Sequence, residues 1–321
     1  MRLFNATMRI KSARRVWPLA LLALCAAGPA PNSPEACAAA PRGELPVHFI
    51  GNQPMVELTM DGASATLLLD TGAEASLLTE ETTRRLRLAA DPTRITVMHG
   101  VGGSSSHANV RVHRLQIAGA VLAEASLAVA PYSFRGANGT PPDGLLGGDV
   151  LANFDVDLDL PHSVVRLFRA RDCVLASPIW NEPAALKADI SIGPGRNILY
   201  LPAMLDGRWL SGLIDTGADM GADIGVVDSA AAAAAGTTAE ALSGTSRIVV
   251  HGAAPRDATA RRHRFGSLVI GLETLSKPTL SVTDLPHGSG ELLIGILYAR
   301  SHRIWISYAS RRMYVGYRTP R

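Results

Sequence analysis

Two stretches of the chain, Leu67-Leu68-Leu69-Asp70-Thr71-Gly72-Ala73 and Gly212-Leu213-Ile214-Asp215-Thr216-Gly217-Ala218-Asp219, carry the same tetrapeptide Asp-Thr-Gly-Ala after an apolar run. A given triplet is expected only about 0.04 times in a chain of this length if residue types were drawn at random. Each copy is also followed by an acid, Glu74 or Asp219. The pair therefore indicates an internal duplication rather than chance.

The duplication extends to the residues before each motif. Asp61-Gly62 and Asp206-Gly207 each begin nine residues before the Asp of the motif, and the two copies are offset by 145 residues. Asp-Gly between apolar stretches is typical of a two-residue β-hairpin turn. Each half is thus predicted to open with a hairpin that leads into Asp-Thr-Gly, with strands at residues 56–60, 66–69, 199–205 and 209–214.

The ends of the two halves also match, here with an offset of 148. Leu145-Leu146-Gly147 corresponds to Leu293-Ile294-Gly295, and each is followed by two strand-like stretches, at residues 156–160 and 164–167 and at 304–308 and 312–315. Helix signals are few: Thr79 begins a short acidic-to-basic segment, and residues 228–235 end at Gly236. The sequence therefore predicts an all-β fold built from two similar lobes.

The boundaries follow from the repeat. We expect the first lobe at residues 45–170 and the second at 188–318, joined by a linker at 171–187 that contains Pro178 and Pro183 and shows no periodicity. A linker of this length lets the two lobes face each other within one chain. A monomer with paired lobes is expected, and pairing between two copies of the chain is the alternative.

Two carboxylates held close together can hydrolyse a peptide bond without a metal or a nucleophilic side chain. Like charges about 3 Å apart do not both ionise readily, so the pair shares one proton. One Asp then accepts a proton from water while the other donates to the carbonyl oxygen. Glycine allows the tight turn beneath the carboxylates, and the threonine hydroxyls offer hydrogen bonds between the loops.

These motifs resemble the active-site loop of retropepsin-like aspartic proteases, and the apolar-apolar-Gly elements resemble the segment that packs behind that loop. The resemblance spans most of residues 45–318 and implies a pepsin-like arrangement of two retropepsin-like lobes in tandem, with the active site between them. It further implies that Asp70 and Asp215 are catalytic, and that Thr71, Gly72, Thr216 and Gly217 support the active-site loops. Glu74 and Asp219 would bind the substrate backbone.

By the same resemblance, residues 96–112 correspond to the β-hairpin flap that covers substrate. Gly100, Gly102 and Gly103 would lie near its tip and contact substrate. A second flap would correspond to residues 247–265, which have a single glycine around the turn. Neither segment contains the aromatic residue that is found in the pepsin flap.

The function expected is that of an aspartic-type endopeptidase acting on peptide or protein substrates. The alternative is a non-catalytic periplasmic peptide-binding or sensor module that keeps the fold. No cofactor and no metal are expected, because His99, His107 and His113 lack a completing Cys or carboxylate. Metal-dependent hydrolysis is the third possibility, and a chelator distinguishes it.

The N-terminus has the pattern of a secretory signal within residues 1–40. Basic residues up to Arg15 precede a short apolar run, and small residues offer cleavage after Ala27, Ala38 or Ala40. A secreted or periplasmic location is expected, with an uncleaved membrane anchor as the alternative. A pro-segment and a disulfide between Cys37 and Cys173 are both left open.

The formal charge of +3 comes from the N-terminal segment. Removing its five Lys/Arg and one acid from totals of 31 and 28 leaves 26 basic and 27 acidic residues. A nearly neutral body gives no electrostatic reason to expect nucleic acid or an anionic membrane surface as a partner.

Overall fold

A computed structural model describes residues 41–100, 103–130, 141–169, 178, 180, 186–189, 191–192, 197–250, 256–285 and 291–317. The predicted signal sequence, Cys37, Cys173, Gly102 and most of the predicted linker lie outside the described residues. No helix in the described segments is long and apolar enough to cross a membrane.

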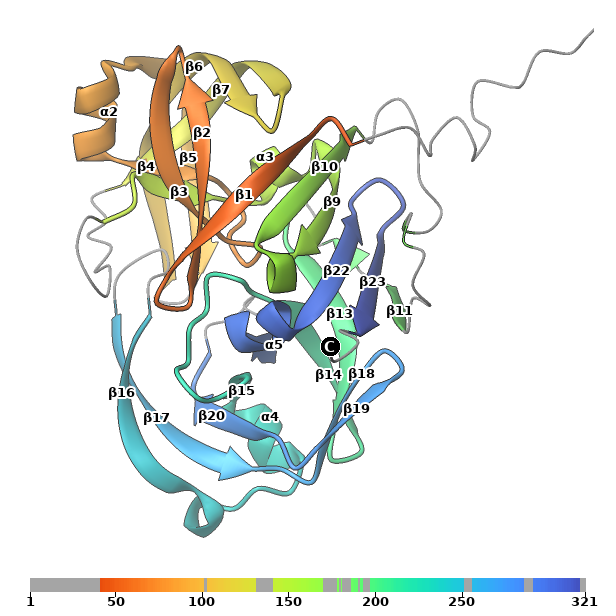
Figure 1. The fold of residues 1–321 in the computed structure, drawn as a ribbon. Helices are drawn as coiled ribbons and strands as arrows, with labels where there is room; N and C mark the ends of the chain where they lie inside the picture. Colours follow the sequence, from red (N-terminus) through yellow and green to blue (C-terminus); the bar gives the residue numbers. More distant parts are fainter. Residues whose placement is uncertain are drawn as a thin grey trace, which may run out of the picture.

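β-Strands dominate both lobes, as predicted for an all-β fold (Figure 1). The first lobe contains β1 (Gly43–Ile50), β2 (Gln53–Met60), β3 (Ala63–Leu69), β4 (Leu77–Thr79), β5 (Ala89–Gly100), β6 (Gly103–Ile117), β7 (Ala120–Ala130) and β8 (Gly144–Leu146). The second contains β13 (Leu199–Leu205), β14 (Arg208–Ile214), β15 (Gly225–Asp228), β16 (Ser243–Val250), β17 (Arg256–Arg264), β18 (Ser267–Ile270), β19 (Glu273–Ser276), β20 (Thr279–Thr283) and β21 (Leu292–Ile294), with β12 (Ser191–Ile192) against β13.

The predicted hairpins are present at the start of each lobe. β2 pairs with β3, and β13 pairs with β14, both antiparallel. The turn residues Asp61 and Gly62 have φ of 49° and 90°, and Asp206 and Gly207 have φ of 45° and 84°. Two consecutive positive φ values match the twist of the flanking strands, which explains the preference for Asp-Gly at these turns.

Each hairpin's second strand continues into a three-strand arrangement that ends at an Asp-Thr-Gly loop. β8 lies parallel to β3, with Leu69 opposite Leu146, and antiparallel to β4. In the second lobe β21 lies parallel to β14, with Ile214 opposite Ile294, and antiparallel to β15. The apolar-apolar-Gly elements are therefore the buried strands beside the two loops.

Both short helices that follow these strands were predicted. Thr79 caps α2 (Glu80–Leu86), accepting a hydrogen bond from the N–H of Thr82, and Asp228 caps α4 (Ser229–Ala234). The other helices in the described part of the chain are α3 (Gly148–Leu151), α5 (Ile296–Ser301) and the 3-10 turns η1 (Leu160–His162) and η2 (Ala239–Ala241). Side chains that cap the first turn stabilise such short helices.

One six-stranded section joins the two lobes, in the order β11 (Leu186–Asp189), β23 (Arg312–Tyr317), β22 (His302–Ser307), β9 (Phe154–Asp159), β10 (Val164–Arg169) and β1. Figure 1 shows β9, β10, β22 and β23 side by side where the upper and lower lobes meet. Asp157 lies opposite Trp305, and these residues occupy equivalent places in the repeat. The halves are therefore related by an approximate two-fold axis through this sheet. The paired terminal strands were predicted, but their union across the lobes was not.

The two faces of this section differ in character. Val156, Leu158, Ile304 and Ile306 point into the main apolar core. Asp155, Asp157 and Asp159 alternate with them and point to the other face, yet all three are buried. Burial of carboxylates requires partners that replace water.

Partners from both lobes satisfy two of these acids, Asp157 and Asp159. Arg303 of β22 donates to both carboxylate oxygens of Asp157, at 2.9 and 2.6 Å, and the Trp180 indole donates to the same group at 3.2 Å. Arg166 and His162 contact Asp159 at 3.1 and 2.6 Å. The Arg303–Asp157 pair thus ties the second lobe to the first.

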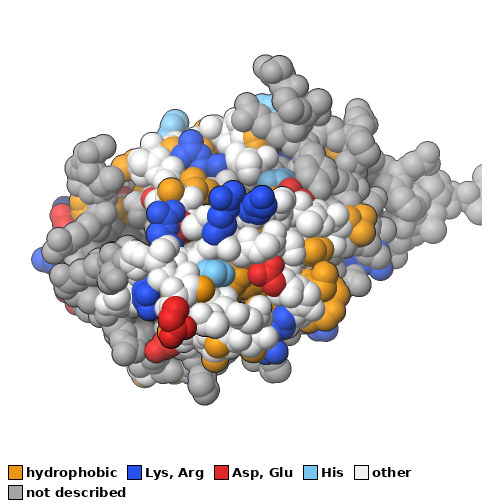
Figure 2. Space-filling view, turned by 90° about the horizontal axis from the view of Figure 1, so that it is seen from below, with side chains coloured by type: hydrophobic (Ala, Val, Ile, Leu, Met, Phe, Trp, Pro, Cys, Tyr) orange, Lys and Arg blue, Asp and Glu red, His pale blue; other side chains and the backbone are white. Residues whose placement is uncertain are grey.

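Figure 2 shows a face of the molecule on which basic side chains gather near the centre with acidic side chains beside them. The charge on this face is therefore mixed in sign.

Candidate active site

The two Asp-Thr-Gly loops meet through their threonines. The N–H of Thr71 donates to Thr216 Oγ1, and the N–H of Thr216 donates to Thr71 Oγ1, both at 3.1 Å. Each hydroxyl in turn donates across the interface: Thr71 Oγ1 to the carbonyl of Ile214 and Thr216 Oγ1 to that of Leu69, both at 2.7 Å. Both threonines are 1% exposed. These four symmetric hydrogen bonds hold the two loops in fixed relation to each other.

Glycine follows each threonine because the carboxylate of the opposite lobe lies directly against it. A Cβ atom on Gly72 would lie 2.3 Å from Cγ of Asp215, and one on Gly217 would lie 2.6 Å from Cγ of Asp70. No side chain fits at either distance. The glycines therefore allow each acid to cross onto the other lobe, which brings the two carboxyl groups together.

Backbone amides orient both carboxyl groups. Asp70 Oδ1 accepts hydrogen bonds from the N–H groups of Gly72 and Ala73, each at 2.9 Å. Asp215 Oδ1 accepts equivalent bonds from Gly217 and Ala218, at 2.9 and 3.0 Å. Each carboxyl group also lies against the glycine of the opposite loop, so the two groups are near neighbours. Neighbouring carboxyl groups do not both ionise readily, so this arrangement is suited to a pair that shares one proton.

The electrostatics of the pair follow from burial and proximity. Burial raises the pKa of Asp70 well above its usual value, and the charge of Asp215 and the hydrogen bond to it raise it further. Burial also raises the pKa of Asp215, but the hydrogen bond from Asp70 and two backbone N–H groups oppose that rise. The pair therefore titrates in two separate steps and holds one proton between the two carboxyl groups after the first.

The strands behind the two Asp-Thr-Gly loops fix the position of each loop's aspartate. The N–H of Asp70 donates to the carbonyl of Leu146 at 3.0 Å, and the N–H of Asp215 donates to that of Ile294 at 2.9 Å. A Cβ on Gly147 would lie 2.8 Å from the backbone of Ala75, and Gly295 is equally crowded against Ala218. The expectation that these elements pack behind the loops is confirmed.

A buried Ser–Asp contact supports the first loop alone. The N–H and hydroxyl of Ser76 both donate to Asp149 Oδ1, at 2.8 and 2.6 Å, and the N–H of Gly147 donates to the Ser76 hydroxyl at 2.9 Å. Burial raises the pKa of Asp149. Neither Ser76 nor Asp149 was predicted, because the second half has Gly221 and Leu297 at the corresponding places and the repeat does not reveal them.

A network across the lobes holds Asp219, one of the two residues predicted to bind substrate backbone. Asn52, in the turn between β1 and β2, donates to Asp219 Oδ1 at 3.1 Å, and Arg300 of α5 donates to Asn52 Oδ1 at 2.9 Å. The N–H of Gly221 also donates to Asp219 at 3.0 Å. Neither Asn52 nor Arg300 was predicted. Glu74, the other predicted residue, is partly buried beside the first loop.

The predicted flaps correspond to hairpins. β5 pairs with β6 up to Gly100 opposite Gly103, so the first hairpin turns at the predicted glycines, of which Gly102 lies outside the described residues. β16 pairs with β17 up to Val250 opposite Arg256, and the turn between them also lies outside. The contacts of Gly100, Gly102 and Gly103 with substrate stay predictions.

The histidines of the first hairpin have separate partners. His107 is bonded to Ser105 at 2.6 Å, and His113 to Glu124 at 3.0 Å. Among the described residues, no three His, Cys, Asp or Glu side chains are grouped so as to hold a metal ion.

Comparison with known proteins identifies what this chain is similar to. Residues 56–150, which include Asp70 and Leu145-Leu146-Gly147, match the aspartyl protease family model. The crystal structure of an aspartic proteinase from Irpex lacteus matches with a TM-score of 0.54 and 16% sequence identity, covering 88% of this chain and 98% of that one. No curated protein sequence matches the chain. The resemblance to aspartyl proteases and the predicted fold class are thereby confirmed.

Proposed function

From an aspartyl protease match in the first lobe and an aspartic proteinase fold over most of the chain, we propose that this protein is an aspartic-type endopeptidase. It hydrolyses peptide bonds through a water molecule activated by Asp70 and Asp215. The observation that supports this most strongly is the crossing of the two carboxyl groups, since Asp70 lies against Gly217 and Asp215 lies against Gly72.

The two carboxyl groups have different tasks in the proposed reaction. In this proposal Asp215 takes a proton from the attacking water, and Asp70, whose pKa burial and Asp215 raise, donates its proton to the carbonyl oxygen of the scissile bond. Both groups are held in place before substrate arrives, because four backbone N–H groups and the threonine bonds orient them. Such preorganisation lowers the barrier, since no reorganisation is needed during reaction.

The substrate class proposed is a peptide or an unfolded segment of a protein, which reaches the pair in a secreted or periplasmic location. Asp219 is the best-supported substrate contact, since Asn52 and Gly221 orient its carboxylate at the junction of the lobes. Glu74 and the tip of the first hairpin complete the proposed binding residues. No metal and no organic cofactor takes part in the proposed reaction.

The test is cleavage of a denatured protein substrate by the wild type, Asp70→Asn and Asp215→Asn. Each variant is expected to lose at least about 10³-fold in kcat, since neither retains a pair that shares one proton. Asp284→Asn, at an exposed acid outside the site, is the matched control and keeps wild-type activity. Melting temperatures show whether the variants are folded.

Full activity in either single variant would contradict the proposal. Activity that a chelator abolishes would indicate metal-dependent hydrolysis. Peptide binding without cleavage, and without effect of a pepstatin-type inhibitor, would indicate the binding module instead.

A further inference from the structure

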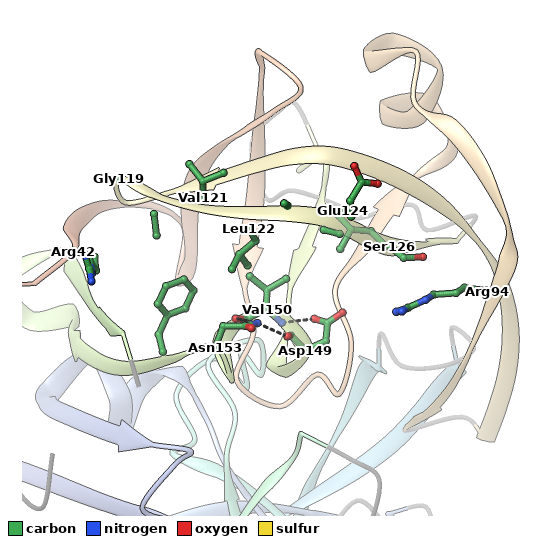
Figure 3. Close-up of a pocket in the computed structure, with 15 residues that line it drawn as sticks. Arg42, Arg94, Gly119, Val121, Leu122, Glu124, Ser126, Asp149, Val150 and Asn153 are labelled. Atoms are coloured by element: carbon green, nitrogen blue, oxygen red, sulfur yellow. Dashed lines mark hydrogen bonds between the residues drawn. The ribbon is translucent and has the colours of Figure 1, made fainter. Parts of the chain in front are cut away.

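The first lobe contains a groove that is separate from Asp70 and Asp215. It has a volume of about 720 Å³ and lies between β7 and α3. Figure 3 shows the strand at residues 119–127 arching over Asp149, Val150 and Asn153, with Leu122 pointing down into the space. The groove is therefore long and narrow and follows a single strand.

The strand that forms the roof has a free edge along the groove. β6 pairs with β7 on one side over residues 120–128. On the other side β4 pairs with β7 only at residues 128–130. No other described strand pairs with residues 120–127. Alternate N–H and C=O groups of this stretch are therefore open to an added strand, and an open edge is the usual template for one.

Arginines line the two ends of the groove. Arg42 lies beside the β6–β7 turn, where a Cβ on Gly119 would be 2.9 Å from its carbonyl oxygen. Arg94 points along the groove from the opposite end (Figure 3). In the floor, Asp149 is engaged by Ser76 and Val150, and the Asn153 amide donates to the carbonyls of Asp149 and Val150. The charges that face an occupant at the ends are thus positive, which favours an extended segment carrying an acid.

The chain itself supplies such a segment next to the groove. The described structure begins at Pro41, and Arg42 already lines one end. Residues 28–40, which follow the first expected cleavage position, contain only small residues, prolines and a single acid, Glu35. Thirteen extended residues reach roughly 40 Å, whereas residues 119–127 span roughly 27 Å, so the segment is long enough to turn back and follow the strand.

We propose that residues 28–40 of the processed chain lie in this groove, adding backbone hydrogen bonds to the free edge of β7 and placing Glu35 against Arg94. The six residues 35–40 contain no proline, so each has an N–H group available for the added bonds. The groove is then a binding site for the chain's own N-terminal extension. This inference does not depend on catalysis.

The shape of β7 limits what else enters. Glu124 has a φ of 55°, a left-handed conformation that interrupts the edge in the middle. A kink of this kind discourages the pairing of whole sheets, because a long flat edge is what sheet-to-sheet association needs. This edge therefore accommodates a single strand of small residues, which pairs with β7 in two short stretches, one on each side of the kink.

Hydrogen–deuterium exchange tests the proposal on the secreted protein and on a chain that begins at Pro41. The mass of the secreted chain must first correspond to a start at Gly28. Outward-facing amides of residues 120–127 are then expected to exchange at least about tenfold more slowly in the longer chain. β19, the edge strand in the corresponding hairpin of the second lobe, is the internal reference and exchanges equally in both.

Charge reversal tests the contact between Glu35 and Arg94. Glu35→Arg and Arg94→Glu should each raise exchange at residues 120–127 towards that of the short chain, and the double variant should restore protection. Arg114→Glu, on neighbouring β6 and outside the groove, is the matched control. Equal exchange in the long and short chains, or a mature start after Ala38 or Ala40, would overturn the proposal. Protection of the short chain that grows with protein concentration would show that a second copy fills the groove instead.

Discussion

Arg303 of the second lobe donates two hydrogen bonds, at 2.9 and 2.6 Å, to Asp157 of the first lobe, whose side chain is completely buried. The pair stands where the approximate two-fold axis crosses the shared sheet. The junction of the lobes is thus partly ionic, and the consequence can be measured.

Replacing Arg303 by Met should lower the free energy of unfolding by up to about 3–5 kcal/mol, because the buried Asp157 then keeps only the more distant Arg166, at 3.6 Å, as a cation. The double change of Asp157→Leu with Arg303→Met should recover most of this loss, since neither charge then remains. Urea unfolding of the three variants measures both effects. A loss in the double variant as large as in the single one would contradict the ionic account.

Thr71→Val removes the hydroxyl that bonds to Ile214 and Thr216 but keeps the shape of the side chain. The expected result is a loss of about 1–3 kcal/mol in stability, because a buried carbonyl and a buried N–H are left without partners. We also expect a lower kcat, since the loops are no longer fixed. Thr71→Ser keeps the hydroxyl and serves as the control; it should retain most of the stability and the activity.

Gly72→Ala should abolish activity by pushing the Asp215 carboxyl away from Asp70, because the new methyl group would lie 2.3 Å from Asp215 Cγ. Gly212→Ala is the matched control in the strand before the second loop, where the added carbon meets its nearest neighbour at 3.4 Å, an ordinary contact. The kcat of each variant, measured on the same substrate, tests this prediction. An active Gly72→Ala enzyme would show that the carboxyl groups need not cross.

The pH–rate profile should be bell-shaped. Activity rises as the first carboxyl, assigned to Asp215, loses its proton, and falls as Asp70 loses the shared one. Because burial and Asp215 hold the pKa of Asp70 well above its usual range, the falling limb should lie above the pH at which an ordinary carboxyl titrates. A rate that keeps rising beyond about pH 9 would contradict a shared proton.

The same pKa gives a stability prediction of definite sign. Asp70 has an ordinary pKa near 3.8 in the unfolded chain and a raised one in the folded chain. Between these two values the folded state binds more protons, so the free energy of unfolding falls as the pH rises through this window. Asp70→Asn cannot lose a proton there and should show a flatter dependence. Denaturant unfolding between pH 4 and pH 8 compares the two; parallel curves would rule out the raised pKa.

The repeat in the sequence predicted what the two halves share. The hairpins at Asp61-Gly62 and Asp206-Gly207, the paired loops and the strands behind them all follow from matching offsets, and the structure has each of them. These features depend on local turn preferences and on apolar strands, which leave a clear pattern along the chain.

Features present in one half only, or made between halves, left no such pattern. Asp149 and Arg300 have no counterpart of the same type in the other half, and the six-stranded union of the lobes depends on contacts between distant segments. In the sequence, the three aspartates of β9 alternate with apolar residues, a pattern that is typical of a strand with one face in solvent. The cations that allow the burial of Asp157 and Asp159, Arg166 and Arg303, come from neighbouring strands.

Each of the two acids lies against the glycine of the opposite lobe, so the distance between the carboxyl groups depends on how far apart the lobes are. If the lobes move apart by a fraction of an ångström, the carboxyl groups of Asp70 and Asp215 separate and their proton affinities converge. Carboxyl chemical shifts followed by NMR during titration would therefore register opening and closing of the whole molecule, with no label placed anywhere else.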